Sequence, residues 1–207
     1  MTNRYVVMIT AEGTIKKTDL IHFSNPRPSG IIAANVADTD RIVDVKMTVE
    51  GKNQSLFIGT RGGMCISFAD SEVRPMGRSA AGVRAINLED KDEVIGMEVL
   101  DREGTIITVT EKGYGKRTPT SEYRGQGRGG KGLIAIKGEE RNGQVVAAQL
   151  CDDTDQVMIV TDGGKIIRMK IADVRPTGRA TMGVRLISLE EVEKVVGVAR
   201  LAERDED

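Results

Sequence analysis

The chain has 207 residues, of which 39% are hydrophobic and 29% are charged, and its formal net charge at pH 7 is −1. Aromatic residues make up 3% and tryptophan is absent, so a surface of stacked rings for single-stranded nucleic acid is not expected. No apolar run approaches the ~18 residues of a membrane-spanning helix. The first residues lead into a predicted strand without a signal peptide, so we expect a cytoplasmic protein with no membrane contact.

A pattern of short β-rich runs recurs four times at a period of about fifty residues. Each run ends in a turn with a threonine and, three residues on, a glycine, and a second glycine follows in each repeat. The threonines are Thr10, Thr60, Thr110 and Thr161; the first glycines are Gly13, Gly63, Gly113 and Gly164; the second glycines are Gly30, Gly82, Gly132 and Gly183. Two anchors that keep this spacing indicate a propeller, a solenoid or a similar array.

Each repeat is predicted to contain four strands, because apolar residues alternate in short runs bounded by Gly, Asp and Asn. In chain order the predicted strands are 5–10, 14–18, 31–36 and 41–47; 55–60, 64–68, 83–88 and 93–100; 105–110, 114–118, 133–137 and 144–150; and 156–161, 165–170, 184–189 and 194–201. No long helical period is present. We therefore expect an all-β fold with four propeller-like blades.

The repeats occupy residues 1–50, 51–100, 101–150 and 151–201, and we expect them to form a single domain, followed by an acidic tail at residues 202–207. Charge is unevenly distributed: Leu189–Asp207 holds seven acids and three bases. The rest of the chain has a net charge of +3, from 27 bases and 24 acids. A polyanion responds to this distribution more than to the total charge.

Basic residues recur in the long loop between the second and third strands of a repeat. Arg78 and Arg179 occupy matching positions, and the corresponding loop of the third repeat contains Gln126, Arg128, Gly129, Gly130 and Lys131. Glycines let a backbone approach a phosphate, and an arginine donates two parallel hydrogen bonds to it. The alternative for each loop taken alone is a glycine-rich connection with solvated charges.

A second basic set lies on the outgoing strand of each hairpin except that of the second repeat, and it consists of Lys16, Lys17, Lys116, Arg117 and Arg168. Around a propeller axis these positions would form a basic band at one edge. A duplex along such a band would meet phosphates more than bases, so binding would be non-specific and salt-dependent. The alternative is a protein-interaction propeller that binds an acidic partner.

No catalytic site, metal site or cofactor is expected. His22 is the only histidine and lies in an apolar run, where a packing or capping role is favoured. Cys65 and Cys151 have no metal-site spacing and are interpreted as reduced core thiols. The glycine-rich run at 125–130 lacks the GxxxxGK[ST] pattern of a nucleotide-binding loop.

Residues 5–201 resemble the C-terminal domain of bacterial DNA gyrase A and, less closely, that of topoisomerase IV. Four phrases carry this resemblance, at residues 12–18, 73–78, 112–118 and 140–143. The resemblance implies a β-pinwheel, a propeller-like disc whose blades exchange strands with their neighbours. It also implies a rim that wraps and bends duplex DNA, which supports ATP-dependent negative supercoiling by the parent enzyme.

One stretch is similar to the gyrase A box of that family, Q-[RK]-R-G-G-[RK]-G. Residues 126–132 match it at six of seven positions, and Gly127 replaces a basic residue. The box usually lies in the first blade of a six-bladed disc, whereas here it lies in the third repeat. The resemblance implies duplex DNA, the remainder of gyrase A, and gyrase B as partners, a nucleoid-associated location, and a chain that is by itself a non-catalytic part of a type II topoisomerase.

Overall fold

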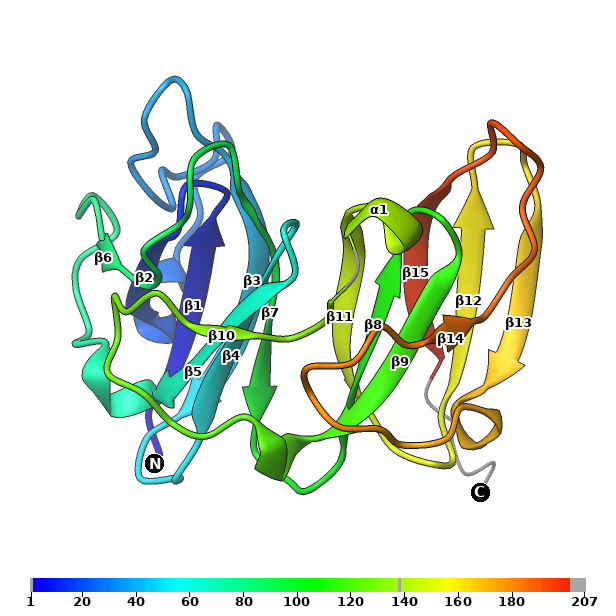
Figure 1. Cartoon of the computed structure of the whole chain (residues 1–207). Coiled ribbons are helices and arrows are strands. Elements are labelled where there is room, and N and C mark those ends of the chain that lie inside the picture. Colours follow the sequence, from blue (N-terminus) through cyan, green and yellow to red (C-terminus); the bar gives the residue numbers. More distant parts are fainter. Residues whose placement is uncertain (1, 138, 202–207) are drawn as a thin grey trace, which may run out of the picture. The chain divides into compact units, whose positions relative to one another are not determined.

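The computed structural model describes residues 2–137 and 139–201, and the acidic tail predicted at 202–207 lies outside them (Figure 1). Strands dominate the described residues. The helical elements are α1 (Glu139–Asn142) and four 3-10 helices, Leu20–Phe23, Asp70–Glu72, Thr120–Glu122 and Ile171–Asp173. None of these helices is long and apolar enough to cross a membrane. The all-β prediction is confirmed.

The strands form four sheets, one for each repeat. In chain order they are β1 (Arg4–Thr10), β2 (Thr14–Asp19), β3 (Ile42–Val49), β4 (Ser55–Thr60), β5 (Met64–Ala69), β6 (Val83–Arg84), β7 (Val94–Leu100), β8 (Thr105–Thr110), β9 (Tyr114–Pro119), β10 (Leu133–Ile134), β11 (Val145–Cys151), β12 (Gln156–Thr161), β13 (Ile166–Lys170), β14 (Val184–Arg185) and β15 (Val195–Leu201). The sheet orders are β3-β1-β2-β6, β10-β5-β4-β7, β11-β8-β9-β14 and β13-β12-β15.

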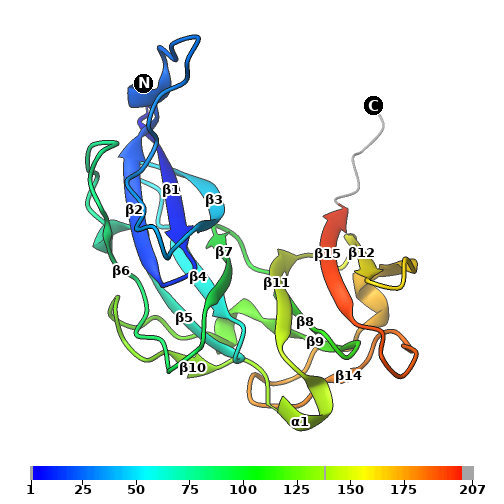
Figure 2. The same ribbon diagram turned by 90° about the horizontal axis from the view of Figure 1, so that it is seen from above.

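Three of the sheets are completed by a short strand from the following repeat. In the first sheet, β6 pairs antiparallel with β2, with Thr14 opposite Arg84, and the two lie side by side in Figure 2. The same pairing joins β10 to β5, with Met64 opposite Ile134, and β14 to β9. The blades therefore exchange strands, as the resemblance implied.

The third strand of each repeat is shorter than predicted. The prediction of 83–88 was too long, because only Val83 and Arg84 pair with β2. The Ala85 amide then donates to the Gly13 carbonyl at 2.8 Å, and Ala85 and Ile86 turn into the core. The predictions of 133–137 and 184–189 were too long in the same way.

The strand predicted at 31–36 is not formed. Its counterparts in the later repeats are strands because each pairs with the hairpin of the repeat before it. Among the described residues, no hairpin pairs with residues 31–36 in this way. Residues 31–36 carry the β-rich pattern, but the described residues contain no hairpin that pairs with it, so no strand forms.

The recurring threonine and glycine close each hairpin. The Thr10 hydroxyl accepts a hydrogen bond from the Thr14 amide at 3.1 Å, and the Gly13 amide donates to the Thr10 carbonyl at 3.0 Å. Gly13 has φ +84°, a left-handed conformation that favours glycine. Repeats two and four contain the same threonine-to-amide bond. This geometry explains why both residue types recur.

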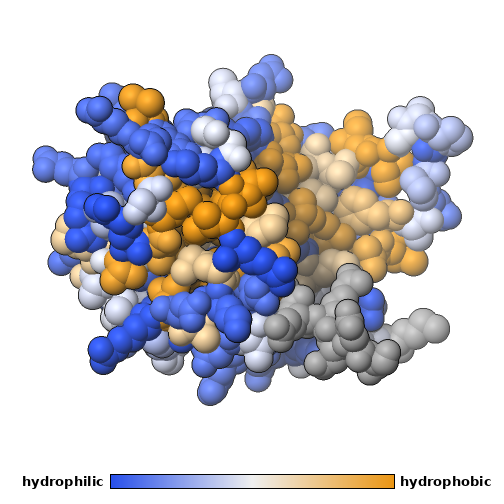
Figure 3. All heavy atoms as spheres, turned by 90° about the vertical axis from the view of Figure 1, so that its right-hand side faces the viewer, coloured by the Kyte–Doolittle hydropathy of each residue, from blue (hydrophilic) through white to orange (hydrophobic). Residues whose placement is uncertain are grey.

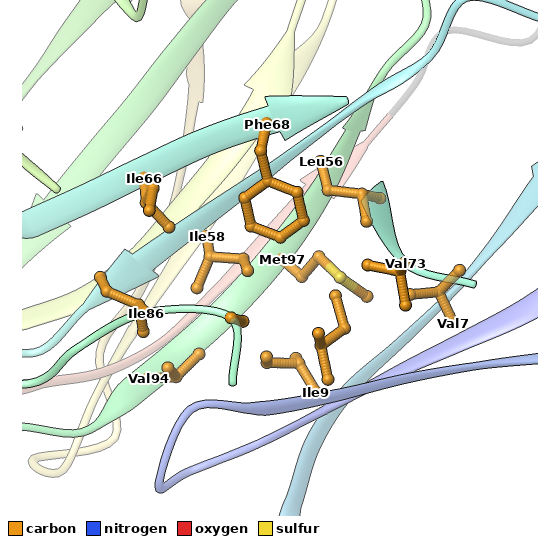
Figure 4. Close-up of a cluster of buried hydrophobic side chains, with 12 residues drawn as sticks. Val7, Ile9, Leu56, Ile58, Ile66, Phe68, Val73, Ile86, Val94 and Met97 are labelled. Carbon is orange, nitrogen blue, oxygen red and sulfur yellow. The ribbon is translucent and has the colours of Figure 1, made fainter. Parts of the chain in front are cut away.

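The chain divides into two compact units. One comprises Met1–Ile58, Ile66–Asp101 and Gly125–Gly132, and the other comprises Gly59–Cys65, Arg102–Arg124 and Leu133–Asp207. The first unit has a core around Phe68, Leu56 and Met97 (Figure 4). The second has its own core, built around Ile107, Ile159 and Val195. Inward-facing residues of the β-rich runs thus supply both cores.

Candidate nucleic-acid interface

The three long loops at residues 74–82, 124–132 and 175–183 carry the recurring basic residues, and each precedes one of the exchanged strands β6, β10 and β14. Loop residues 74–82 and 125–132 belong to the first compact unit, and 175–183 belong to the second. Within each loop the arginines fall into two groups that differ in exposure and in hydrogen bonding.

The inner arginines, Arg78, Arg128 and Arg179, hold the loops to the preceding repeat. Their guanidinium groups donate to the backbone carbonyls of Ile32 at 2.7 Å, Arg84 at 2.5 Å and Ile134 at 2.6 Å, respectively. Each of these carbonyls belongs to the second residue after the second glycine of its own repeat. All three arginines are half-buried. They were predicted to contact DNA, but the structure gives each of them a bond within the fold.

The outer arginines are Arg74, Arg124 and Arg175, and they were not singled out from the sequence. Each is exposed and lies eight residues before the second glycine of its repeat. Within the described ranges no hydrogen bond or ion pair to these side chains is found. A recurring spacing in three repeats would have identified them. They are the exposed, unneutralised charges that the three loops have in common.

The box-like loop at residues 124–132 is held by several backbone hydrogen bonds. The backbone N–H of Gln126 donates to Ser67 O at 2.8 Å. The backbone N–H of Gly129, which has φ +82°, donates to Ala85 O at 2.7 Å. The Arg128 amide donates to a carboxylate oxygen of Glu72 at 2.9 Å. Gly130 O accepts from the Asn87 amide at 2.9 Å. The backbone of the box-like sequence is thus fixed before any ligand arrives.

Two side-chain donors in this loop have no acceptor among the described residues. They are Nε2 of Gln126 and Nε of Arg128, and both atoms lie below the surface. A buried donor without a partner is uncommon in native proteins and calls for an explanation. A phosphate could reach these atoms only if the loop opened locally. Lys131, in contrast, is exposed at the end of the same loop.

The paired lysines of the first hairpin are buried rather than displayed. Lys16 is 3% exposed, and its ammonium group donates to Ala33 O at 3.1 Å and to Arg78 O. Lys17 is 4% exposed and forms an ion pair with Asp70. Its Nζ also lies 4.5 Å from the centre of the Tyr5 ring. These charges serve the fold.

Lys116 and Arg117 repeat this arrangement in the second compact unit. Lys116 is 1% exposed and donates to Gly178 O at 2.8 Å and to Arg179 O. Arg117 donates to Val174 O and pairs with Asp153. The expected basic band on the hairpin strands is therefore not exposed at these four positions. Arg168 is exposed, and its Nε donates to Gln156 at 2.6 Å.

The burial of Lys116 leads to a pH-dependent prediction. Burial lowers the pKa of Lys116 to about 8, whereas an unfolded lysine titrates near 10.4. Between these values the unfolded chain holds the proton that the folded chain has lost, so the contribution to stability rises with pH across this window. We expect the unfolding free energy of the parent minus that of Lys116→Met to increase by about 2 kcal/mol from pH 8 to pH 10.

The measurement is urea unfolding followed by circular dichroism at pH 7, 8, 9 and 10. Burial also raises the pKa of Cys65 to about 12, which lowers stability above the thiol's usual range. Because both proteins retain Cys65, this effect largely cancels in the difference. A difference that stays constant with pH would show that Lys116 remains fully protonated in the folded chain throughout.

A cluster around Tyr114 adds exposed positive charge to the second unit. The guanidinium carbon of Arg141 lies 4.5 Å from the centre of the Tyr114 ring, and that of Arg185 lies 5.4 Å from it. Arg185 donates to the tyrosine hydroxyl at 2.9 Å, which lowers the pKa of Tyr114. Arg141 also donates to Met182 O and Gly183 O, so it supports the long loop there.

The two cysteines and the single histidine are the remaining residues that the sequence analysis considered. Cys65 and Cys151 are free and buried, as predicted. His22 was expected to have a packing or capping role; it is exposed in the last turn of the 3-10 helix Leu20–Phe23, so the packing role was wrong. In the part of the chain that the structure describes, no three His, Cys, Asp or Glu residues are grouped in a way that could hold a metal ion.

Four sheets of one design, three of which are completed by a strand from the following repeat, define a propeller-like repeat domain of the pinwheel type. The family model for the DNA gyrase C-terminal domain, a beta-propeller, matches residues 4–48, 54–101, 104–152 and 155–202. The chain belongs to this family. The four matches also confirm the number of repeats.

The chain is similar to DNA gyrase A of Salmonella typhimurium, with 45% identity over 202 residues, and to that of Escherichia coli K12, with 42% identity over 198 residues. These matches cover 98% and 96% of this chain but only 23% and 22% of the relatives. The crystal structure of a topoisomerase IV C-terminal domain matches 97% of this chain and 62% of that chain, with 27% identity and a TM-score of 0.90. A gyrase A C-terminal domain matches 96% of this chain and 66% of that chain; at 23% identity, its TM-score of 0.85 supports the fold alone.

Proposed function

We propose that this chain binds duplex DNA without sequence preference and bends it, as a non-catalytic module of a DNA gyrase. The observation that carries the proposal is the recurrence of an exposed arginine at one position of three long loops, Arg74, Arg124 and Arg175. Exposed arginines suit the phosphate backbone, which every duplex sequence presents alike. Membership of the gyrase C-terminal family supports the same function.

The binding residues fall into three classes under this proposal. The outer arginines and Lys131 contact phosphates directly, since their charges are exposed. Arg78, Arg128 and Arg179 position the loops and offer their remaining N–H groups, because each arginine has five donors. Lys16, Lys17, Lys116 and Arg117 act through the fold, and Arg168 is an additional exposed contact.

The parent assembly completes the proposed function. We propose that the four repeats act as one domain within gyrase A, alongside gyrase B, in the cytoplasm and in association with the nucleoid. The wrapped duplex then supports ATP-dependent negative supercoiling that is catalysed elsewhere in the type II topoisomerase. The chain itself would carry out no reaction.

The proposal is tested by titrating the chain with fluorescent duplexes of random sequence at 50 to 300 mM salt. Each phosphate contact contributes ~0.9 to the slope of log affinity against log salt, so the five exposed contacts (the three outer arginines, Lys131 and Arg168) predict a slope of about −4.5. Two unrelated duplex sequences should bind equally. A slope near zero would contradict DNA binding and would favour the alternative, a module that binds an acidic protein partner.

Bending is tested separately at the box-like loop. We expect Lys131→Ala to lower affinity modestly with no loss of stability, because its side chain is exposed. We expect Arg128→Ala to reduce the bend more than the affinity, since the loop loses its bond to Arg84 O. Energy transfer between dyes at the two ends of a short duplex measures the bend at saturating protein. An Arg128→Ala variant that bends DNA as fully as the parent would make this loop a connector only.

A further inference from the structure

An isoleucine and a leucine from the following repeat cover the turn glycine of the first hairpin. A Cβ atom placed at Gly13 would lie 3.1 Å from Ile86 Cγ2 and 3.6 Å from Leu88 Cδ1. Leu88 also packs against the core of the first unit. Two acidic residues, Glu89 and Asp90, follow it in the sequence. An aliphatic side chain carried by an acidic segment thus fills the place beside this glycine.

The third hairpin is covered in the same way by the fourth repeat. A Cβ atom placed at Gly113 would lie 2.9 Å from Ile187 Cγ2 and 3.4 Å from Leu189 Cδ1. Leu189 packs against the core of the second unit and also lines a cavity of about 280 Å³. It is again followed by two acids, Glu190 and Glu191. The chain therefore places the same kind of segment, a leucine followed by two acids, beside both glycines.

The second hairpin lacks this leucine. The three atoms nearest to a Cβ atom placed at Gly63 all belong to Ile136, and the third of them lies at 3.9 Å. In the sequence, Gly138 takes the position of Leu88 and Leu189; it lies outside the described residues. A glycine has no side chain that could replace a leucine. The third repeat thus keeps the isoleucine of the pair and omits the leucine.

A cavity of about 800 Å³ lies at this place, within the second compact unit. Its apolar lining comes from three repeats: Met64 beside the turn glycine, Ile134 and Ile136 of the third repeat, and Met182 of the last long loop. The volume falls within the ~300–1,000 Å³ that is typical of ligand sites. Methionine side chains adapt readily to the shape of an apolar guest. The repeats that border the cavity are all present in the chain.

Positive charge flanks the apolar lining. Lys137 and Arg141 line the cavity, and both residues are exposed. Lys137 stands where the other two places have the neutral residues Asn87 and Ser188. Glu140 lines the cavity as well, so two cations and one acid leave a net charge of +1. A guest that combines an aliphatic side chain with carboxylates fits both the lining and its charge.

We propose that this cavity binds a segment of a partner protein in which a leucine is followed by acidic residues. The leucine enters between Met64, Ile136 and Met182, and the carboxylates pair with Lys137 and Arg141. This guest is favoured because the chain itself fills both equivalent places with such a segment. The site is separate from the proposed DNA contacts, since none of the three outer arginines lines it.

The probe is the pentapeptide Ser-Leu-Glu-Glu-Val, which copies residues 188–192, with both ends blocked. The full chain is labelled with ¹³C at its methionine methyl groups. The peptide is titrated to about 10 mM, because we expect a dissociation constant on the order of 1 mM. The methyl signals of Met64 and Met182 are expected to shift. The same peptide with glycine in place of leucine should bind about 10- to 100-fold more weakly, since no aliphatic side chain is buried.

Adhesion of the peptide to exposed apolar surface would give a different pattern. Figure 3 views the molecule from the side on which β13 lies in Figure 1, and apolar side chains are exposed on that face. Ile166 of β13 is 63% exposed. Met158 is half-buried and lies opposite Arg168 of the same strand, so its methyl signal reports on this face. We expect the Met158 signal to stay unchanged.

Two variants test the charge and the missing leucine. Lys137→Glu is expected to weaken peptide binding roughly fivefold. Its matched control, Lys170→Glu, makes the same charge change at an exposed position of β13 and should leave binding unchanged. Gly138→Leu gives the third repeat the leucine of the other two, so we expect the peptide shifts to disappear. Circular dichroism checks that each variant is folded.

Other occupants would give other results. Equal shifts with the leucine and glycine peptides would overturn the proposal, because charge alone would then account for binding. Unchanged Met64 and Met182 signals at the highest peptide concentration would overturn it too. A duplex that shifts the same two signals, and loses this effect in Lys137→Glu, would assign the cavity to DNA and against the proposal. The salt dependence of duplex binding is measured on its own, so failure of the peptide leaves the proposed DNA function standing.

Discussion

Replacement of Asp70 by alanine is expected to lower the free energy of unfolding by about 3–5 kcal/mol. Asp70 and Lys17 form a buried ion pair, with side chains that are 9% and 6% exposed. Removal of the carboxylate leaves the Lys17 ammonium in a low-dielectric interior, near the Tyr5 ring and Asp70 O. Urea unfolding followed by circular dichroism would measure the loss.

The matched control is Asp153→Ala. Asp153 pairs with the buried Arg117, but its own side chain is 77% exposed, so water can replace it. We expect a loss of ~1 kcal/mol or less for this variant. The double replacement Lys17→Met with Asp70→Leu should recover most of the stability, because it removes both charges together. Equal losses for Asp70→Ala and Asp153→Ala would contradict the importance of burial.

Simultaneous replacement of Arg74, Arg124 and Arg175 by glutamine is expected to weaken duplex binding by roughly 10³-fold at 50 mM salt. If each arginine contacts one phosphate, the slope of log affinity against log salt falls in magnitude by ~2.7, and the two lines converge towards 1 M salt. Stability should change little, since these side chains are exposed. Fluorescence anisotropy across a salt series measures both the affinity and the slope.

The control for this variant removes the same number of positive charges from positions outside the long loops. Arg4, Lys52 and Lys91 are exposed and lie outside the long loops, and their triple replacement by glutamine removes the same three charges. We expect this control to retain most of the affinity and the slope. If both triple variants lose affinity equally, the protein responds to total charge, and the loops have no special role.

The hairpins could be predicted from the sequence because their determinants are local. A threonine and a glycine at fixed spacing in each turn define the two strands on either side. The exchanged strands were harder, since residues 31–36 and 83–88 have similar β-rich patterns. In the described part of the chain, only residues 83–84 of the second pattern pair with a hairpin from another repeat. Whether such a segment becomes a strand depends on a partner far away in the chain.

The candidate site was predicted less well, because whether a basic side chain is exposed depends on residues from other repeats that pack against it. Lys16 and Lys17 are consecutive, and the alternation of side chains along a strand predicts that at least one of them points outwards. Both are nevertheless buried, since Asp70 and the carbonyl of Arg78 reach them from the next repeat. The loops themselves were identified correctly, but the division between inner and outer arginines required the hydrogen-bond pattern.

Strand exchange also has a consequence for synthesis on the ribosome. The first sheet cannot be finished when its own repeat has emerged, because β6 belongs to the second repeat. At ~5–20 residues per second, the roughly 34 residues between the end of the first repeat and Arg84 take about 2–7 seconds to appear. During that interval the nascent edge of β2 is open to other chains on the same message. Each newly made repeat would thus protect the one made before it.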